Sequence, residues 1–163
     1  MSFKVINVEH EDYMQLAIEE ASKGLKKKHG GPFGAVIVKD GKVIARAHNT
    51  VLKNNNPTQH AEINAISNAS KKLKRFDLSE CTIYVTVEPC PMCLSAIHWA
   101  KITTVVFGAT VKDAHKCGFN EIPLSNKDLN KLGHLNITLI PGILKKECKA
   151  LFEVFKKNKI STY

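Results

Sequence analysis

The feature of the sequence that most restricts its fold is a pair of short motifs about thirty residues apart. The first is His60-Ala61-Glu62 and the second is Pro89-Cys90-Pro91-Met92-Cys93. One imidazole and two thiols are ligands of the kind that a tetrahedral Zn²⁺ takes, and a catalytic zinc site leaves its fourth position to water. We therefore predict that His60, Cys90 and Cys93 bind zinc, so the fold must bring the two motifs together.

Glu62 lies two residues after the histidine, where it can handle protons beside a metal-bound water without binding the metal. Zinc lowers the pKa of a bound water to about 7, which makes hydroxide available at neutral pH. The pattern His-x-Glu followed by Pro-Cys-x-x-Cys is the known signature of zinc-dependent nucleobase deaminases. It predicts an enzyme that deaminates a base by hydrolysis, with zinc-bound hydroxide as nucleophile and Glu62 as proton shuttle.

Helix and strand patterns alternate along the chain after one hairpin, which Asp40-Gly41 indicates. The expected helices are 9–28, 60–75, 92–100, 125–132 and 143–157, with a single possible turn inside 110–120. The expected strands are 35–39, 42–47, 82–87, 103–109 and 135–140. These elements predict one α/β domain over residues 1–163, with a mixed five-stranded sheet flanked by helices in three layers.

The expected positions of the ligands agree with this architecture. Cys90 and Cys93 lie three residues apart at the start of one helix, so both sulfur atoms can face the same side. His60 begins the preceding helix. In a sheet with helices on its faces, helix N-termini meet at the carboxyl ends of neighbouring strands, where such folds build their sites.

Composition gives the expected location and leaves the partners open. The N-terminus lacks the apolar run of a signal peptide, and no segment is long and apolar enough for a membrane span. The number of cysteines, five, is odd, so they cannot all pair in disulfides within the chain. We expect a cytoplasmic protein in which Cys81, Cys117 and Cys148 are structural. The net charge of +9 could attract RNA or could simply reflect a lysine-rich surface.

The chain resembles the cytidine deaminase-like superfamily over nearly its whole length, and within it the bacterial guanine deaminases most. The segments that carry the resemblance are 30–38, 55–62, 88–94, 96–100, 113–114 and 118–121. The resemblance implies a cytidine deaminase-like fold, one Zn²⁺ per subunit and the conversion of guanine to xanthine and ammonia in purine metabolism. It assigns zinc binding to His60, Cys90 and Cys93, and proton transfer to Glu62.

The resemblance also implies a purine pocket. Its lining residues would be Phe33, Asn49, Ala61 and Trp99. Glu121 would contact the substrate and assist proton transfer, although the usual family residue there is Asp, so the glutamate is a mild departure. Tyr163 would close the pocket from the partner subunit of a domain-swapped homodimer. From the residues alone, Phe33 could equally cap the core, Asn49 could cap a turn, and Trp99 should be partly buried in its helix.

Two other readings remain open at the level of sequence. A tRNA-specific adenosine deaminase, which converts wobble adenosine to inosine, would share both motifs and the strand end at 106–109, and would suit the charge of +9. Such enzymes usually have Pro-Val-Gly-Ala where this chain has Pro32-Phe33-Gly34-Ala35. A zinc-stabilised nucleic-acid-binding module without catalysis would need the three ligands but not Glu62.

Overall fold

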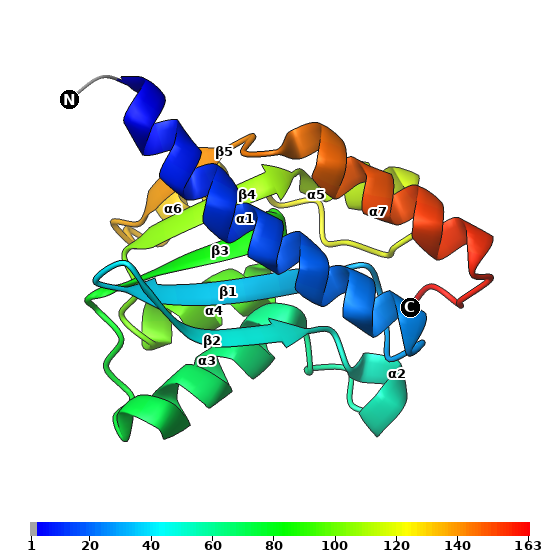
Figure 1. Ribbon diagram of the computed structural model, residues 1–163, viewed down its shortest axis with the longest axis horizontal. Coiled ribbons are helices and arrows are strands. Elements are labelled where there is room, and N and C mark those ends of the chain that lie inside the picture. The colour runs from blue at the N-terminus through cyan, green and yellow to red at the C-terminus, as the bar shows by residue number, and fades with distance from the viewer. Residues whose placement is uncertain (1–2) are drawn as a thin grey trace.

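The computed structural model describes residues 3–163, and their side chains from residue 9 onward. The helices are α1 (Phe3–Lys26), α2 (Val51–Asn54), α3 (Ala61–Leu73), α4 (Pro91–Trp99), α5 (Val111–Lys116), α6 (Asn126–Leu132) and α7 (Lys145–Lys157). The strands are β1 (Gly34–Lys39), β2 (Lys42–His48), β3 (Cys81–Val87), β4 (Thr104–Ala109) and β5 (Thr138–Pro141). Figure 1 shows their arrangement.

The five strands form one mixed sheet in the order β2-β1-β3-β4-β5. β1 runs antiparallel to both of its neighbours, whereas β3, β4 and β5 are mutually parallel. The carboxyl ends of β2, β3, β4 and β5 therefore lie at the same end of the sheet, together with the start of β1. This confirms the mixed five-stranded α/β fold that the sequence predicts.

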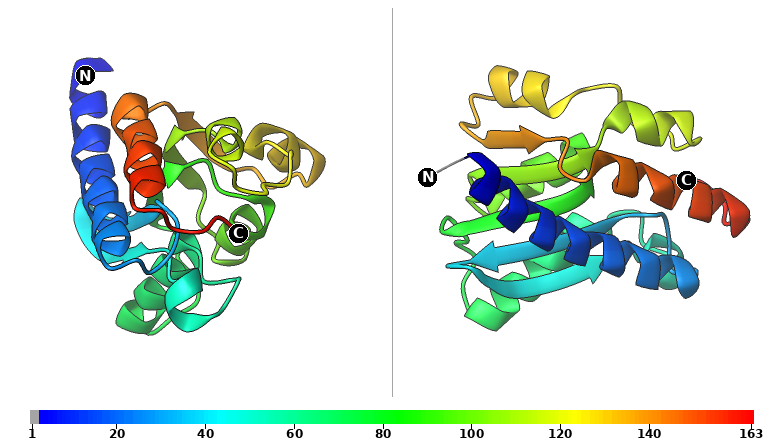
Figure 2. Two further views of the ribbon diagram at one scale, coloured as in Figure 1. Left: turned by 90° about the vertical axis from the view of Figure 1, so that its right-hand side faces the viewer. Right: turned by 45° about the horizontal axis from the view of Figure 1, so that its top comes forward.

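Helices cover both faces of the sheet. α1 and α7 pack side by side on one face, and α3 and α4 lie on the other (Figures 1 and 2). The interior strand β1 is buried on both sides: Ala35 and Ile37 join the core under α3 and α4, and Val36 and Val38 join the core under α1 and α7. A continuous apolar run suits this position because neither face meets water.

Several element ends differ from the sequence prediction, and local contacts explain them. α1 begins at Phe3, so the acidic residues near position 9 are not in its first turn. The segment expected as a loop after β2 contains the one-turn α2. β5 begins three residues later than predicted, because Asn136 has a positive φ of 55° and the Asn130 side chain bonds both backbone groups of Ile137.

Two further expectations concern the chain as a whole. Within the part of the chain that the structure describes, no helix is long and apolar enough to cross a bilayer. All five cysteines are free thiols. Ser125 caps α6, with its hydroxyl accepting from the backbone N–H of Asp128.

Candidate active site

The site residues gather at the sheet edge that holds the carboxyl ends of β2, β3 and β4. Asn49 follows β2, Glu88 follows β3, and Phe33 directly precedes β1. Because β1 runs against the other strands, its beginning lies beside their ends. Segments up to 88 residues apart in the chain therefore border one small cavity, lined by Phe33, Gly34, His60, Glu62, Val85, Thr86, Val87, Glu88, Cys90 and Glu121.

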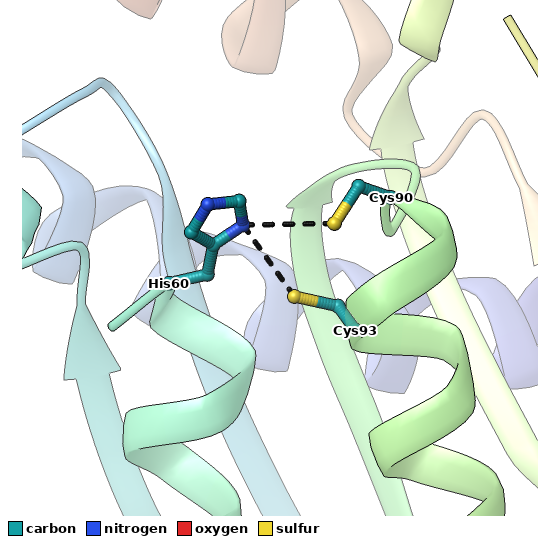
Figure 3. Close-up of side chains that lie close together, drawn as sticks. All are labelled: His60, Cys90 and Cys93. Carbon is teal, nitrogen blue, oxygen red and sulfur yellow. Dashed lines mark hydrogen bonds between the residues drawn. The ribbon is translucent and has the colours of Figure 1, made fainter. Parts of the chain in front are cut away.

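The three predicted ligands lie together at the starts of α3 and α4 (Figure 3). His60 is the residue that caps α3, Cys90 occupies the same position in α4, and Pro91 fixes the first helical residue after it. The Nδ1 atom of His60 lies 3.7 Å from the Sγ atom of Cys90 and 3.5 Å from that of Cys93. A tetrahedral zinc with Zn–S near 2.3 Å and Zn–N near 2.0–2.1 Å has N···S edges of about 3.5 Å, so the donor set fits Zn²⁺.

The two thiols differ in their readiness to ionise. A hydrogen bond from Cys93 lowers the pKa of Cys90 to about 4, with His60 adding to the effect against the opposing cost of burial. The same hydrogen bond and burial raise the pKa of Cys93. Zinc binds cysteine as thiolate, so its binding would release the proton that Cys93 keeps.

Glu62 is the second residue of α3 and only 7% exposed. Its carboxyl group lines the same cavity as His60 and Cys90. In the described part of the chain it makes no ion pair with a cationic side chain, and burial raises its pKa to about 7. A carboxyl group that can be protonated or ionised near neutral pH suits the transfer of protons.

The cavity also contains two of the predicted pocket residues. Phe33 lines the cavity and also packs edge-on against Phe119 in the core, with 5.0 Å between the two ring centroids. Glu121 lines it from the segment between α5 and α6. Burial raises the pKa of Glu121, and the nearby thiolate of Cys90 adds to the effect.

Asn49 and Ala61 are buried next to residues that line this cavity: the backbone N–H of Asn49 donates to the Phe33 carbonyl at 3.1 Å, and Ala61 lies between His60 and Glu62 in the chain. The Oδ1 atom of Asn49 accepts from the backbone N–H of Val51 at 3.0 Å, as in a turn cap. Its Nδ2 atom is buried and makes no hydrogen bond of good geometry in the described part of the chain, and the Tyr163 hydroxyl is the polar group that interacts with the Asn49 amide. Gly30 packs directly on the Asn49 amide, where a side chain would not fit. Ala61 is the first residue of α3, so its backbone N–H has no partner inside the helix.

Tyr163 folds back onto its own chain. Its hydroxyl accepts a hydrogen bond from the backbone N–H of Gly31 at 3.0 Å, and its ring stacks edge-on against Phe119 at 5.6 Å. Within this single chain the C-terminal tail thus reaches the surroundings of the site. The domain-swapped arrangement stays a prediction. Burial raises the pKa of the Tyr163 phenol.

Trp99 does not lie where the sequence prediction put it. Its side chain is 79% exposed, so the expectation of partial burial is wrong. Cys90 lies at the cavity end of α4 and Trp99 is the last residue of that helix. Nine residues at 1.5 Å each place it about 13 Å along the helix from Cys90, too far to reach this chain's own cavity.

Sequence reasoning assigned no role to two further residues at the site. Glu88, which borders the cavity, accepts backbone hydrogen bonds from Val111 at 3.1 Å and Asn126 at 2.8 Å. Asn126 is 1% exposed and its side-chain amide donates to the Pro89 carbonyl at 2.6 Å. The position of Glu88 next to Pro89-Cys90 was a signal available in the sequence, but nothing local marked Asn126.

Comparison with known proteins agrees with this geometry. Residues 7–109 match the family model described as the cytidine and deoxycytidylate deaminase zinc-binding region. The chain belongs to this family. Membership makes it a zinc-binding hydrolytic deaminase, and the matched span contains His60, Glu62, Cys90 and Cys93.

Three relatives with known names are similar to the chain over most of its length. Guanine deaminase from Bacillus subtilis is 46% identical over 112 residues, covering 69% of this chain and 72% of that protein. The solved structure of guanine deaminase from Nitrosomonas europaea has a TM-score of 0.83 at 30% identity, covering 90% of this chain and 84% of the other. tRNA-specific adenosine deaminase from Buchnera aphidicola subsp. Baizongia pistaciae is 39% identical over 135 residues, or 80% of each chain.

Proposed function

We propose that this protein hydrolyses guanine to xanthine and ammonia. The observation that carries the proposal is the buried carboxyl group of Glu62, which borders the same cavity as the His60 and Cys90 ligand groups and lacks a cationic partner in the described chain. A purely structural zinc site needs no such group, since its metal is fully coordinated by protein ligands. Guanine is chosen because two guanine deaminases are similar to this chain over most of its length.

In this proposal His60, Cys90 and Cys93 hold one Zn²⁺ per subunit, which would supply a nucleophile at neutral pH by lowering the pKa of water. Glu62 takes one proton from the attacking water and delivers it to a ring nitrogen, then takes the second proton from the hydroxyl group formed at C2 and delivers it to the amino group, which leaves as ammonia. Guanine plus water gives xanthine plus ammonia, so one carboxyl group acting first as base and then as acid balances the reaction. Burial of Glu62 keeps bulk water from competing for these protons.

The remaining site residues would recognise the base. The Nδ2–H of Asn49, which has no hydrogen bond of good geometry in the described chain, can donate to a ring carbonyl, and the Glu121 carboxylate can accept from a ring N–H. The ring of Phe33 offers an apolar surface for the base, the free N–H of Ala61 can donate to it, and Tyr163 would cover it. A buried donor left without a partner is costly, so a substrate acceptor at Asn49 would contribute to discrimination.

We also propose a homodimer built on the outer side of α4. Met92 and Trp99 lie seven residues apart, hence on one side of the helix, and are 36% and 79% exposed. Large exposed apolar groups in a row are typical of interaction surfaces. Trp99 could then meet a partner subunit although it cannot reach its own cavity.

Deamination of wobble adenosine in tRNA is the second candidate, favoured by the net charge of +9 and by the tRNA-specific relative. The test is ammonia release from zinc-loaded protein given guanine, adenine, cytosine, their nucleosides and an anticodon stem-loop with wobble adenosine. Turnover of guanine above all others is the expected result. Turnover of the stem-loop alone would replace the proposal with the tRNA function, and no turnover with zinc bound would refute both.

A further inference from the structure

Glu88 borders the cavity but its carboxylate is already occupied. Oε1 accepts from the backbone N–H of Asn126 at 2.8 Å and Oε2 accepts from that of Val111 at 3.1 Å. Val111 and Asn126 are the first residues of α5 and α6, whose leading N–H groups have no acceptor inside their own helices. With each oxygen engaged by a backbone donor, Glu88 is placed to hold structure rather than to move protons.

Asn126 makes a second connection to the same place. Its backbone N–H bonds Glu88, and its side-chain amide donates to the carbonyl of Pro89 at 2.6 Å. Pro89 is the residue between Glu88 and the ligand Cys90. Asn126, at the start of α6, therefore forms hydrogen bonds with two consecutive residues of the segment that leads to the ligand Cys90. Its side chain is 1% exposed, so water does not compete for these bonds.

Both helices that Glu88 joins flank the segment that carries Glu121. That segment leaves α5 at residue 117 and enters α6 at residue 126. Glu88 ties the starts of both helices to one carboxylate. The same side chain consequently connects the Cys90 segment with the helix before and the helix after Glu121.

We propose that Glu88 and Asn126 are positioning residues that hold Glu121 at a fixed position relative to the metal ligands. They form a brace, defined by the hydrogen bonds of Glu88 to Val111 and Asn126 and of Asn126 to Pro89. The brace acts on substrate binding through Glu121 and on the ligand set through the Pro89-Cys90 segment. It rests on the proposed function for its kinetic test, but its effect on the ligands can be measured without turnover.

The test compares Asn126→Ala with Ser125→Ala. The first removes the side-chain bond to Pro89 while leaving the backbone N–H on Glu88. The second removes the N-cap of the same helix, a bond between Ser125 and Asp128 that faces solvent and lies outside the brace. Both variants weaken the start of α6, so a difference between them reports the brace and not the stability of the helix.

Two readouts are taken on each protein: KM and kcat for guanine, and the visible spectrum of the Co²⁺-loaded enzyme, which reports the geometry of the ligands. Asn126→Ala should raise KM about tenfold, change kcat by less than about threefold and shift the Co²⁺ bands, whereas Ser125→Ala should match the wild type in all three. Glu88→Gln, which offers one oxygen where two are needed, should resemble Asn126→Ala.

An unchanged KM and spectrum in Asn126→Ala would overturn the proposal, as would equal changes in Ser125→Ala. If the wild type does not turn over guanine, the proposed function fails. The Co²⁺ spectra then still decide between a brace that sets the ligands and one that does not.

Discussion

Two glutamates of this molecule have nearly the same small exposed fraction but opposite character. Glu20 on α1 is 8% exposed and Glu62 on α3 is 7% exposed. Glu20 lies 2.7 Å from Lys23 Nζ and 3.2 Å from Arg46 Nε. Burial pushes its pKa up, but the hydrogen bond from Lys23 leads the interactions that bring it below the ordinary value. Glu62 has no such cation in the described chain, and burial raises its pKa to about 7.

The comparison shows that surface exposure alone does not decide whether a carboxyl group stabilises the fold or carries protons: Glu20 has cationic partners, whereas Glu62 is more deeply buried and has none of that kind in the described chain. Glu20 joins α1 to β2 as a permanent charge, because Arg46 and His48 of β2 both face it. Glu62 is left to gain and lose a proton beside the metal ligands. Paired removal of the two charges should therefore separate catalysis from stability.

The largest effect is expected for Glu62→Gln. The amide keeps the shape of the side chain but cannot transfer protons, so kcat on guanine should fall by about 10³-fold or more. Zinc content and the thermal midpoint should stay near those of the wild type, since no ion pair is lost. Ammonia release and metal analysis on the same preparation measure both. Wild-type turnover in this variant would contradict the role given to Glu62.

Glu20→Gln should show the reverse. Losing the charge leaves Lys23, Arg46 and His48 facing a neutral amide, and we expect the free energy of unfolding to drop by about 1–2 kcal/mol. Because Glu20 lies away from the cavity, kcat and KM should change by less than about twofold. Urea denaturation and steady-state kinetics provide the measurements. A large loss of turnover in Glu20→Gln with unchanged stability would contradict the structural role assigned to Glu20.

The acid limb of the stability curve should separate Glu20→Gln from the wild type. The folded-state pKa of Glu20 lies below its unfolded value of about 4.3, so its stabilisation is complete above that pH. It is lost as pH falls through the folded pKa. The difference in unfolding free energy between wild type and variant should accordingly be constant near neutrality and shrink below about pH 4. A difference that persists at the lowest pH would mean that packing, not charge, explains Glu20.

Lys23→Ala should have the smallest effect. The lysine side chain is 55% exposed, so water and salt screen its pair with Glu20, and we expect a loss below about 1 kcal/mol. The loss should shrink further in high salt. Denaturation at low and high ionic strength gives the measurement. A loss as large as that of Glu20→Gln would show that Lys23 alone stabilises the buried charge.

The metal ligands and the sheet were predictable because their signals are local. Three ligand types at fixed spacing define the zinc site, and alternating helix and strand patterns define the layers. The structure confirms the five-stranded mixed sheet and brings His60, Cys90 and Cys93 together as the spacing requires.

What could not be predicted depends on contacts between distant segments. The 79% exposure of Trp99 follows from which side of α4 meets a neighbour, and its seven-residue step from Met92 puts both on the open side. Asn126 lies 37 residues from the Pro89 carbonyl that it bonds, so no local pattern marks it. The return of Tyr163 to Gly31 spans 132 residues and likewise exists only in three dimensions.

The most direct test of the account measures wild type, Glu62→Gln and Glu20→Gln side by side, each with its zinc content determined, for ammonia release from guanine. The account predicts one zinc per chain in all three, near-normal turnover in Glu20→Gln and essentially none in Glu62→Gln. Equal turnover in the two variants would contradict it, because two buried glutamates with different partners would then have been shown to act alike.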